Sequence, residues 1–383
     1  MSSFENWLKD SIGLEIPSLG IEKMRHFFNK YLHSHFPKII TVAGTNGKGE
    51  SCHYLSHYFE EAGLKVGRWT SPHVYSILER FHFTDAAVNE NELLETAKEL
   101  LILMDNEGLK LSYYEFLFSC FCLLSKQREI DVLILEVGLG GRLDSVNLFD
   151  ADIIALTSIS LDHTEILGDN EIDILQEKLG VCRVNKPLYS SIYQLELLDY
   201  LTAFTSQQSI SWTNLYDELL DYSRLNHLLV SAILQNEFDI KVSDYIHIKS
   251  PGRGNKVVIK GHEFELYGSH NQAGINCLLR RIGDQKDFSY DRIILSFSDR
   301  PDDEVISILK ELISFCPRGV DLSVYSFSHF KAKKNLQQLL QNHNLDSFYK
   351  GEFSSQVFET NTPKNLVLGS YYFIENFRPE GKS

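Results

Sequence analysis

The sequence predicts an α/β fold in which a parallel, right-handed wound sheet is followed by a second, smaller α/β unit. Apolar runs typical of buried strands recur along the first half of the chain, at 39–42, 66–70, 131–136 and 152–157. Amphipathic patterns typical of helices lie between them, at 91–104 and 113–124. Strands that alternate with helices form parallel sheets with right-handed connections, and this alternation defines the fold class.

A glycine-rich turn follows the first apolar run, in the motif Gly44-Thr45-Asn46-Gly47-Lys48-Gly49. We expect a helix at 52–62, ended by Gly63, whose positive N-terminus faces this turn. The glycines allow backbone N–H groups to surround an anion, and Lys48 is placed to reach the β- and γ-phosphates of a nucleotide. The motif therefore predicts a phosphate-binding loop, although glycine-rich turns also occur in ordinary loops.

The composition is that of a globular protein, with 43% hydrophobic and 23% charged residues among 383. The formal charge of −15 argues against nucleic acid or membrane as a partner, because both require a basic face. Six cysteines without a CxxC pair indicate buried thiols in a reducing compartment. The N-terminus lacks an apolar signal core, and the most apolar run, 113–124, is too short to span a bilayer. We therefore expect a cytoplasmic protein.

A domain boundary is expected where the apolar pattern weakens, near 241–250, just before Pro251-Gly252-Arg253-Gly254. This gives domains 1–248 and 249–383. The first begins with a helical lead-in, 1–38, and ends with helices at 195–204 and 222–234. In the second we expect a hairpin of strands 256–259 and 263–267, then helices at 272–282, 302–315 and 331–341 and strands at 292–297, 321–327 and 365–368.

Four polar residues follow the carboxyl ends of the expected strands in the first domain: Lys48, Ser71, Glu136 and His163. Ligands of wound parallel sheets bind beyond these strand ends. Taken singly, Ser71 could be a turn residue, Glu136 a salt-bridge partner and His163 a polar loop residue. Their common placement favours a ligand-binding site at this edge of the sheet.

Several collinear motifs resemble the folylpolyglutamate synthase/dihydrofolate synthase family of the Mur ligase superfamily. They are GTNGKG (44–49), TSPH (70–73), ER (79–80), LEVGLGGRLD (135–144) and LDHTEILGD (161–169). The similarity continues in EK (177–178), PGR (251–253), GSHN (268–271) and LVLGSYY (366–372). It spans both expected domains in the family's order.

The resemblance implies a cytoplasmic, ATP-dependent carbon–nitrogen ligase of folate biosynthesis and one-carbon metabolism. Its Mur ligase-like fold would combine a P-loop, parallel-sheet ATP-binding domain with a smaller C-terminal α/β ligase domain. A carboxylate of dihydropteroate or a reduced folate would take the γ-phosphoryl group of ATP, and the amine of L-glutamate would attack the acyl phosphate. The resemblance also implies Mg²⁺, and we expect a monomer.

The resemblance carries roles onto single residues. Catalytic roles fall on Lys48, His163 and Lys178, and metal positions on Ser71, Glu136 and His163. Nucleotide contacts fall on Thr45, Asn46, Gly47, Lys48, Gly49, Asn226, Arg253, Tyr267 and His270. Folate contacts fall on Ser112, Tyr113, Tyr114, Glu115, Leu143, Asp144 and Ser145.

The lysine that Lys178 matches is carried by the family as a carbamate. Only a neutral amine reacts with carbon dioxide, so burial or a nearby cation must lower its pKa. Without the resemblance, Lys178 would be interpreted as a solvated helix residue. Likewise, 112–115 would be helix packing and 143–145 a turn.

The chain departs from the family at two nucleotide positions. Glu50 replaces a serine or threonine, and Tyr267 replaces an aspartate that contacts the nucleotide. A carboxylate at a helix N-terminus gains only ~0.3–1 kcal/mol, whereas like charges ~5 Å apart cost on the order of 3 kcal/mol at an effective dielectric near 20. We therefore expect weakened ATP affinity unless Glu50 turns away or binds a metal.

Three functions remain open at this point. One is an active ligase, and a second is a degenerate folate- or nucleotide-binding member without catalysis, which Glu50 and Tyr267 favour. The third is a ligase of the same superfamily with another acid acceptor.

Overall fold

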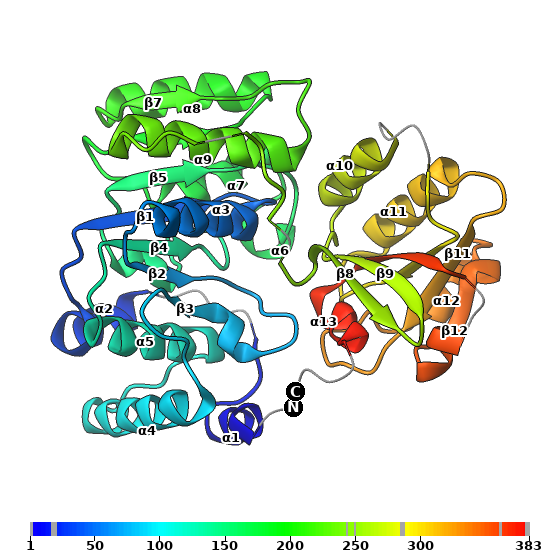
Figure 1. Ribbon diagram of the computed structural model, residues 1–383, viewed down its shortest axis with the longest axis horizontal. Coiled ribbons are helices and arrows are strands. Elements are labelled where there is room, and N and C mark those ends of the chain that lie inside the picture. The colour runs from blue at the N-terminus through cyan, green and yellow to red at the C-terminus, as the bar shows by residue number, and fades with distance from the viewer. Residues whose placement is uncertain are drawn as a thin grey trace. The chain divides into compact units, whose positions relative to one another are not determined.

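The computed structural model describes residues 3–16, 21–242, 244–248, 250–283, 288–359 and 362–379. The chain divides into two compact units, 1–248 and 249–383. Each unit is built on its own sheet (Figure 1).

Unit 1 is built on a seven-stranded sheet in the order β3-β2-β4-β1-β5-β6-β7. All neighbouring strands are parallel except the edge pair β2–β3. The strands are β1 (Lys38–Ala43), β2 (Val66–Trp69), β3 (Phe81–Phe83), β4 (Val132–Glu136), β5 (Ile153–Leu156), β6 (Leu188–Ser190) and β7 (Trp212–Asn214). The continuous apolar runs of β1, β4 and β5 are buried because helices cover both faces of the sheet.

Helices α3 (Lys48–Glu61) and α9 (Tyr222–Phe238) lie side by side and pack on one face of this sheet (Figure 1). The other face carries a larger core, to which the remaining helices contribute. These are α1 (Ser3–Ser11), α2 (Glu22–Phe27) with a π-helical turn (Phe28–Leu32), α4 (Glu90–Glu107), α5 (Tyr113–Lys126), α6 (Thr164–Leu167), α7 (Glu171–Leu179) and α8 (Leu195–Gln207). Two 3₁₀ turns, Ile77–Arg80 and Ser145–Leu148, lie in the connections after β2 and β4.

Unit 2 is built on a six-stranded sheet in the order β12-β11-β10-β13-β9-β8. The hairpin of β8 (Arg253–Ile259) and β9 (His262–Tyr267) is antiparallel, and the other pairs are parallel. The remaining strands are β10 (Arg292–Ser296), β11 (Asp321–Ser326), β12 (Tyr349–Glu352) and β13 (Lys364–Gly369). The helices are α10 (Gln272–Gly283), α11 (Asp302–Phe315), α12 (Leu336–Asn342) and α13 (Tyr371–Ile374), with 3₁₀ turns at Asp346–Phe348, Ser355–Glu359 and Glu375–Phe377.

The predicted α/β fold class is confirmed, with two differences in detail. Strands β3, β6, β7 and β12 were not expected, because runs of three or four residues give too weak a pattern. The helix expected at 331–341 was wrong in its first half. Asn335 takes a left-handed φ of 55° and α12 begins only at Leu336, while Ala332 bridges to Ser298. Over the described ranges, every helix is too short or too polar to cross a membrane.

Candidate active site

The phosphate loop, residues 44–48, joins the end of β1 to the first turn of α3. Gly44 has a φ of 139°, and a Cβ there would lie 1.9 Å from the Thr157 hydroxyl oxygen. Gly47 has a φ of 90°, and a Cβ there would lie 2.5 Å from Nδ2 of Asn226. Both positions therefore require glycine, because a side chain would be strained by the backbone and would also collide with a neighbour.

The segment after β5 supports this loop from the neighbouring strand. The Thr45 amide donates to the Ser158 carbonyl at 2.6 Å, and the Thr157 hydroxyl donates to the Asn46 carbonyl at 2.7 Å. The Ser160 amide donates to the Thr45 hydroxyl at 3.1 Å. Sequence reasoning missed these supporting residues, although the Thr-Ser-Ile-Ser run at the end of β5 was a signal for them.

Lys48 is the first residue of α3, and its side chain folds back over the loop. Its ammonium donates to the carbonyls of Gly44 at 3.0 Å and Thr45 at 3.1 Å. The positive charge thus lies over the turn, where the helix N-terminus also attracts an anion.

Glu50 lies in the first turn of the same helix, and α9 holds its carboxylate. Oε1 accepts a hydrogen bond from the Ser223 hydroxyl at 2.6 Å, and Oε2 accepts one from the Asn226 amide at 2.8 Å. Asn226, a predicted nucleotide contact, is therefore at the phosphate loop, but its amide group already serves Glu50.

Two of the three predicted metal residues are joined by a hydrogen bond. The Ser71 amide donates to Oε2 of Glu136 at 2.9 Å, and this carboxylate is buried at the end of β4. His163 has a left-handed φ of 51° and is half-exposed beside Glu165, 3.7 Å away. The described hydrogen bonds and ion pairs do not join it to Glu136. One carboxylate with a nearby hydroxyl suits Mg²⁺, which keeps several waters and binds phosphates. In the part of the chain that the structure describes, three or more His, Cys, Asp or Glu side chains never gather into a metal site.

Lys178 is buried in the last turn of α7 and is 4% exposed. Burial first, and then the positive charge of Lys48, lowers the pKa of Lys178 to about 7, against the opposing effect of Asp162 and Asp144. The amine thus feels the charge of Lys48, and about half of it is neutral near pH 7. This is the state that the proposed carbamylation requires.

Two predicted folate segments meet at Asp144 and Tyr114. Oδ2 of Asp144 accepts from the amides of Gly138 and Leu139, both at 2.9 Å, and the Tyr114 hydroxyl donates to Oδ1 at 3.2 Å. Burial raises the pKa of Asp144 to about 6 and that of Tyr114 well above its usual range. Trp69 donates its indole N–H to Tyr114 at 3.2 Å, a contact that sequence reasoning missed.

The other residues of these segments mainly begin α5 or pack against it. Ser112 and Glu115 form a capping box, with the Ser112 amide 2.7 Å from Glu115, whose carboxylate also pairs with Lys23 at 2.9 Å. Tyr113 faces the buried guanidinium of Arg80 at 5.7 Å from its ring centroid. The remaining two, Leu143 and Ser145, pack in the core, with Ser145 donating to Met24 at 3.5 Å.

In unit 2, Arg253 and Tyr267 are partners across the β8–β9 hairpin, but their side chains have different neighbours. The guanidinium of Arg253 lies 5.3 Å from the Tyr371 ring centroid, and the His270 ring lies 5.8 Å from the same ring. Tyr267 instead packs in the core of unit 2 and donates its hydroxyl to Glu265 at 2.8 Å. The nucleotide contact of Tyr267 stays a prediction.

No family model matches the chain, but it is similar to curated proteins and to solved structures. A dihydrofolate synthase/folylpolyglutamate synthase of Buchnera aphidicola is 42% identical over 148 residues, 39% of this chain and 36% of that protein. Here and in four further curated relatives, the chain spans only 34–38% of their length. The Bacillus subtilis protein of the same name is 24% identical over 94% of both chains.

A solved structure shows that the likeness extends to the whole fold. It is a bifunctional folylpolyglutamate synthase/dihydrofolate synthase with Mn, AMPPNP and L-glutamate bound. The match covers 98% of this chain and 97% of the chain in that structure. The TM-score is 0.77 at 24% identity. The fold and the phosphate loop define a two-domain α/β protein of the Mur ligase-like class. Within that class, the chain is a homologue of the dihydrofolate synthase/folylpolyglutamate synthases.

Proposed function

We propose that the chain is an ATP-dependent ligase that joins L-glutamate to dihydropteroate, to reduced folates or to both. The observation that carries this proposal is Lys178, a lysine buried at the end of α7 whose pKa of about 7 leaves about half of its amine neutral near pH 7. Burying a lysine costs stability even with Asp162 and Asp144 acting against the shift, and the phosphate loop alone does not need one. A carbamate at this amine would explain the burial, because only the neutral amine reacts with carbon dioxide.

The proposed reaction has two steps. A carboxylate oxygen of the pteroate or folate attacks the γ-phosphorus of ATP, and ADP leaves. The glutamate amine then attacks the acyl carbon, phosphate leaves, and the nitrogen loses a proton. Residues 1–248 are the proposed ATP-binding domain and 249–383 the proposed C-terminal ligase domain.

Each proposed role rests on a local property of this chain. Thr45, Asn46, Gly47, Lys48 and Gly49 would hold the phosphates, because the loop directs a lysine and a helix N-terminus at one anion. Ser71 and Glu136, joined by a hydrogen bond, would hold Mg²⁺, with His163 as the third position. The cation would neutralise phosphate charge during transfer.

The remaining proposed contacts divide between folate and nucleotide. Asp144 and Tyr114 would bind the folate through polar atoms that already meet. Ser112, Tyr113, Glu115, Leu143 and Ser145 support them by forming the start of α5 and the turn after β4. Asn226, Arg253, Tyr267 and His270 remain proposed nucleotide contacts. We also propose a monomer in the cytoplasm, a reducing compartment that suits a sequence with six cysteines and no CxxC pair.

One observation favours a second candidate, a non-catalytic folate- or nucleotide-binding protein. Glu50 adds a negative charge beside the phosphate loop, and Tyr267 removes the aspartate of the nucleotide site. Such a protein would bind ATP or folate without turning it over.

Phosphate release from ATP distinguishes the two candidates. The ligase predicts release that requires both L-glutamate and dihydropteroate or a reduced folate, with a product heavier by one glutamyl residue in mass spectrometry. Lys48→Ala should abolish it, whereas Lys98→Ala, an exposed change on α4, should not. Binding of ATP or folate without release would overturn the ligase proposal in favour of the second candidate.

A further inference from the structure

The last turn of α7, which carries Lys178, lies directly against the glycine turn, residues 138–144. A Cβ on Gly141 would lie 2.8 Å from the Glu177 carbonyl oxygen and 3.0 Å from Cα of Lys178. A Cβ on Gly180 would lie 2.3 Å from Cβ of Arg142. The two backbones therefore touch with no side chain between them, and this close approach helps to exclude water from Lys178.

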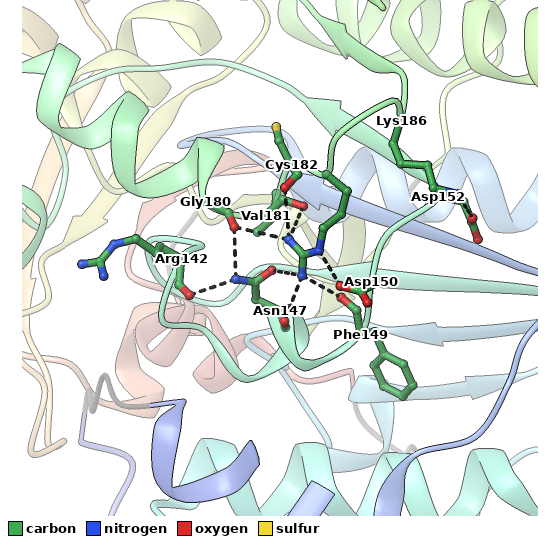
Figure 2. A network of polar contacts seen from close by, with 10 residues as sticks. Arg142, Asn147, Phe149, Asp150, Asp152, Gly180, Val181, Cys182 and Lys186 are labelled. Carbon is green, nitrogen blue, oxygen red and sulfur yellow. Dashed lines mark hydrogen bonds and ion pairs between the residues drawn. The ribbon is translucent and has the colours of Figure 1, made fainter. Parts of the chain in front are cut away.

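Asn147, in the 3₁₀ turn Ser145–Leu148, joins the glycine turn to the end of α7 through its side chain. Its amide Nδ2 donates to the Arg142 carbonyl at 2.9 Å, on the glycine turn, and to the Gly180 carbonyl at 3.2 Å, at the end of α7 (Figure 2). The side chain is 8% exposed, so these bonds are protected from water. One amide group thus bridges the two sides of the contact.

The Arg183 guanidinium completes the bridge. It donates to Oδ1 of Asn147 at 2.9 Å and to the carbonyls of Val181 at 3.1 Å and Cys182 at 3.2 Å. These two carbonyls belong to the turn that directly follows α7, and a longer contact of 3.5 Å reaches the carbonyl of Gly180, the residue that ends the helix. A planar guanidinium can meet several such acceptors at once, which an ammonium group cannot do equally well.

We infer that Arg183 and Asn147 are positioning residues for Lys178. They hold the end of α7 against the glycine turn, and so keep the Lys178 amine in the closed environment where carbon dioxide adds to it. The inference rests on the proposed function in so far as the carbamate serves ligation. In the step itself, the amine nitrogen bonds to the carbon of CO₂, one C–O π bond opens to a carboxylate, and the nitrogen releases a proton to solvent.

Burial supports this inference independently of the contacts. Water entering between α7 and the glycine turn would solvate the ammonium form of Lys178 and raise its pKa toward the ordinary value. The amine would then be protonated near pH 7 and would not react. Loosening this contact should therefore lower carbamate occupancy even when the fold survives.

The test is carbon-13 NMR of the full chain equilibrated with ¹³C-bicarbonate, compared among four proteins. The wild type should show a carbamate resonance that Lys178→Met lacks. In Arg183→Met, the carbamate resonance should be at least ~10-fold weaker than in the wild type, an effect of the size seen when residues that orient site residues are removed. It should recover in part at higher bicarbonate. Arg142→Met is the matched control, because it removes only the exposed ion pair with Glu177 and leaves the backbone acceptors in place.

Each outcome separates the positioning role from the ligase activity. A folded Arg183→Met protein with wild-type carbamate, or a wild type without carbamate, would overturn the inference. If Arg183→Met does not fold, Asn147→Ser removes the amide bridge with a smaller change and is judged by the same signal. A wild type that carries carbamate but forms no glutamyl product would refute the proposed activity while leaving the positioning role in place.

Discussion

The carboxylate of Glu50 accepts a hydrogen bond from the side-chain amide of Asn226 at 2.8 Å, which ties the phosphate-loop helix α3 to α9. Ser223 adds a second bond at 2.6 Å, so both carboxylate oxygens face α9. Asn226 also lies against Gly47, where an added Cβ would be 2.5 Å from its Nδ2. The negative charge of Glu50, which the family's motif lacks, is therefore held beside the phosphate loop by α9.

Glu50→Gln should tighten ATP binding. The change removes the charge but keeps one oxygen as an acceptor, so the link to α9 largely survives. Halving the ~3 kcal/mol of like-charge repulsion for screening leaves roughly tenfold in affinity at low salt. The gain should shrink as salt rises, because salt screens the pair.

Calorimetric titration of ATP at two salt concentrations measures this effect. Glu61→Gln is the matched control, because it removes the same charge at the far, exposed end of α3. Equal affinity of Glu50→Gln and wild type at both salts would mean that α9 turns the charge away from the phosphates.

Gly44→Ala should destabilise the fold much more than Gly63→Ala. Both glycines have positive φ, 139° and 79°, but only at Gly44 would the new Cβ meet Thr157. Backbone strain alone costs about 1–2 kcal/mol, and overpacking adds about 1–3 kcal/mol. Urea denaturation of the two variants isolates the collision, and equal losses would show that Thr157 moves aside at little cost.

Glu136→Gln should abolish metal-dependent turnover while leaving the fold intact. The amide oxygen can still accept from the Ser71 amide, so only the negative charge is lost. We expect Mn²⁺ affinity, measured by electron paramagnetic resonance, to fall about 10–100-fold. Glu99→Gln, an exposed change on α4, should bind Mn²⁺ like the wild type. Wild-type Mn²⁺ affinity in Glu136→Gln would remove Glu136 from the proposed metal site.

The sequence predicted the central strands and the polar residues at their ends, because long apolar runs mark these strands. Strands β1, β4 and β5 were predicted because each is buried on both faces, and parallel strands bring their polar ends to one edge. By contrast, β7 is only three residues long and none of them is buried, so its place beside β6 is set by tertiary contacts. Short edge strands of this kind leave no periodic pattern in the sequence.

The partners of site residues were harder to predict. Nothing local links Glu50 to Ser223 and Asn226, since α9 reaches α3 only through the folded core. The hydrogen bond from Tyr267 to Glu265 was easier to predict, because residues two apart on a strand share a face.

Lys178→Met should stabilise the protein, and the gain should shrink as pH rises from 7 to 10.5. The folded-state pKa of Lys178 is lowered to about 7 from 10.5, chiefly by burial. Between these values the unfolded chain binds a proton that the folded chain has released, so wild-type stability rises with pH. Below pH 7 both states are protonated, and the full penalty of a buried ammonium remains. At 1.36 kcal/mol per pKa unit the change is on the order of 5 kcal/mol.

Urea denaturation in CO₂-free buffer from pH 6 to 10 measures the difference between Lys178→Met and wild type. Carbon dioxide is excluded because a carbamate on Lys178 would no longer titrate as an amine. Lys98→Met, an exposed change on α4, corrects for the loss of one positive charge. If the difference in unfolding free energy stays constant with pH, then Lys178 keeps its ordinary protonation in the folded state. The argument for a neutral, reactive amine at this position would then fail.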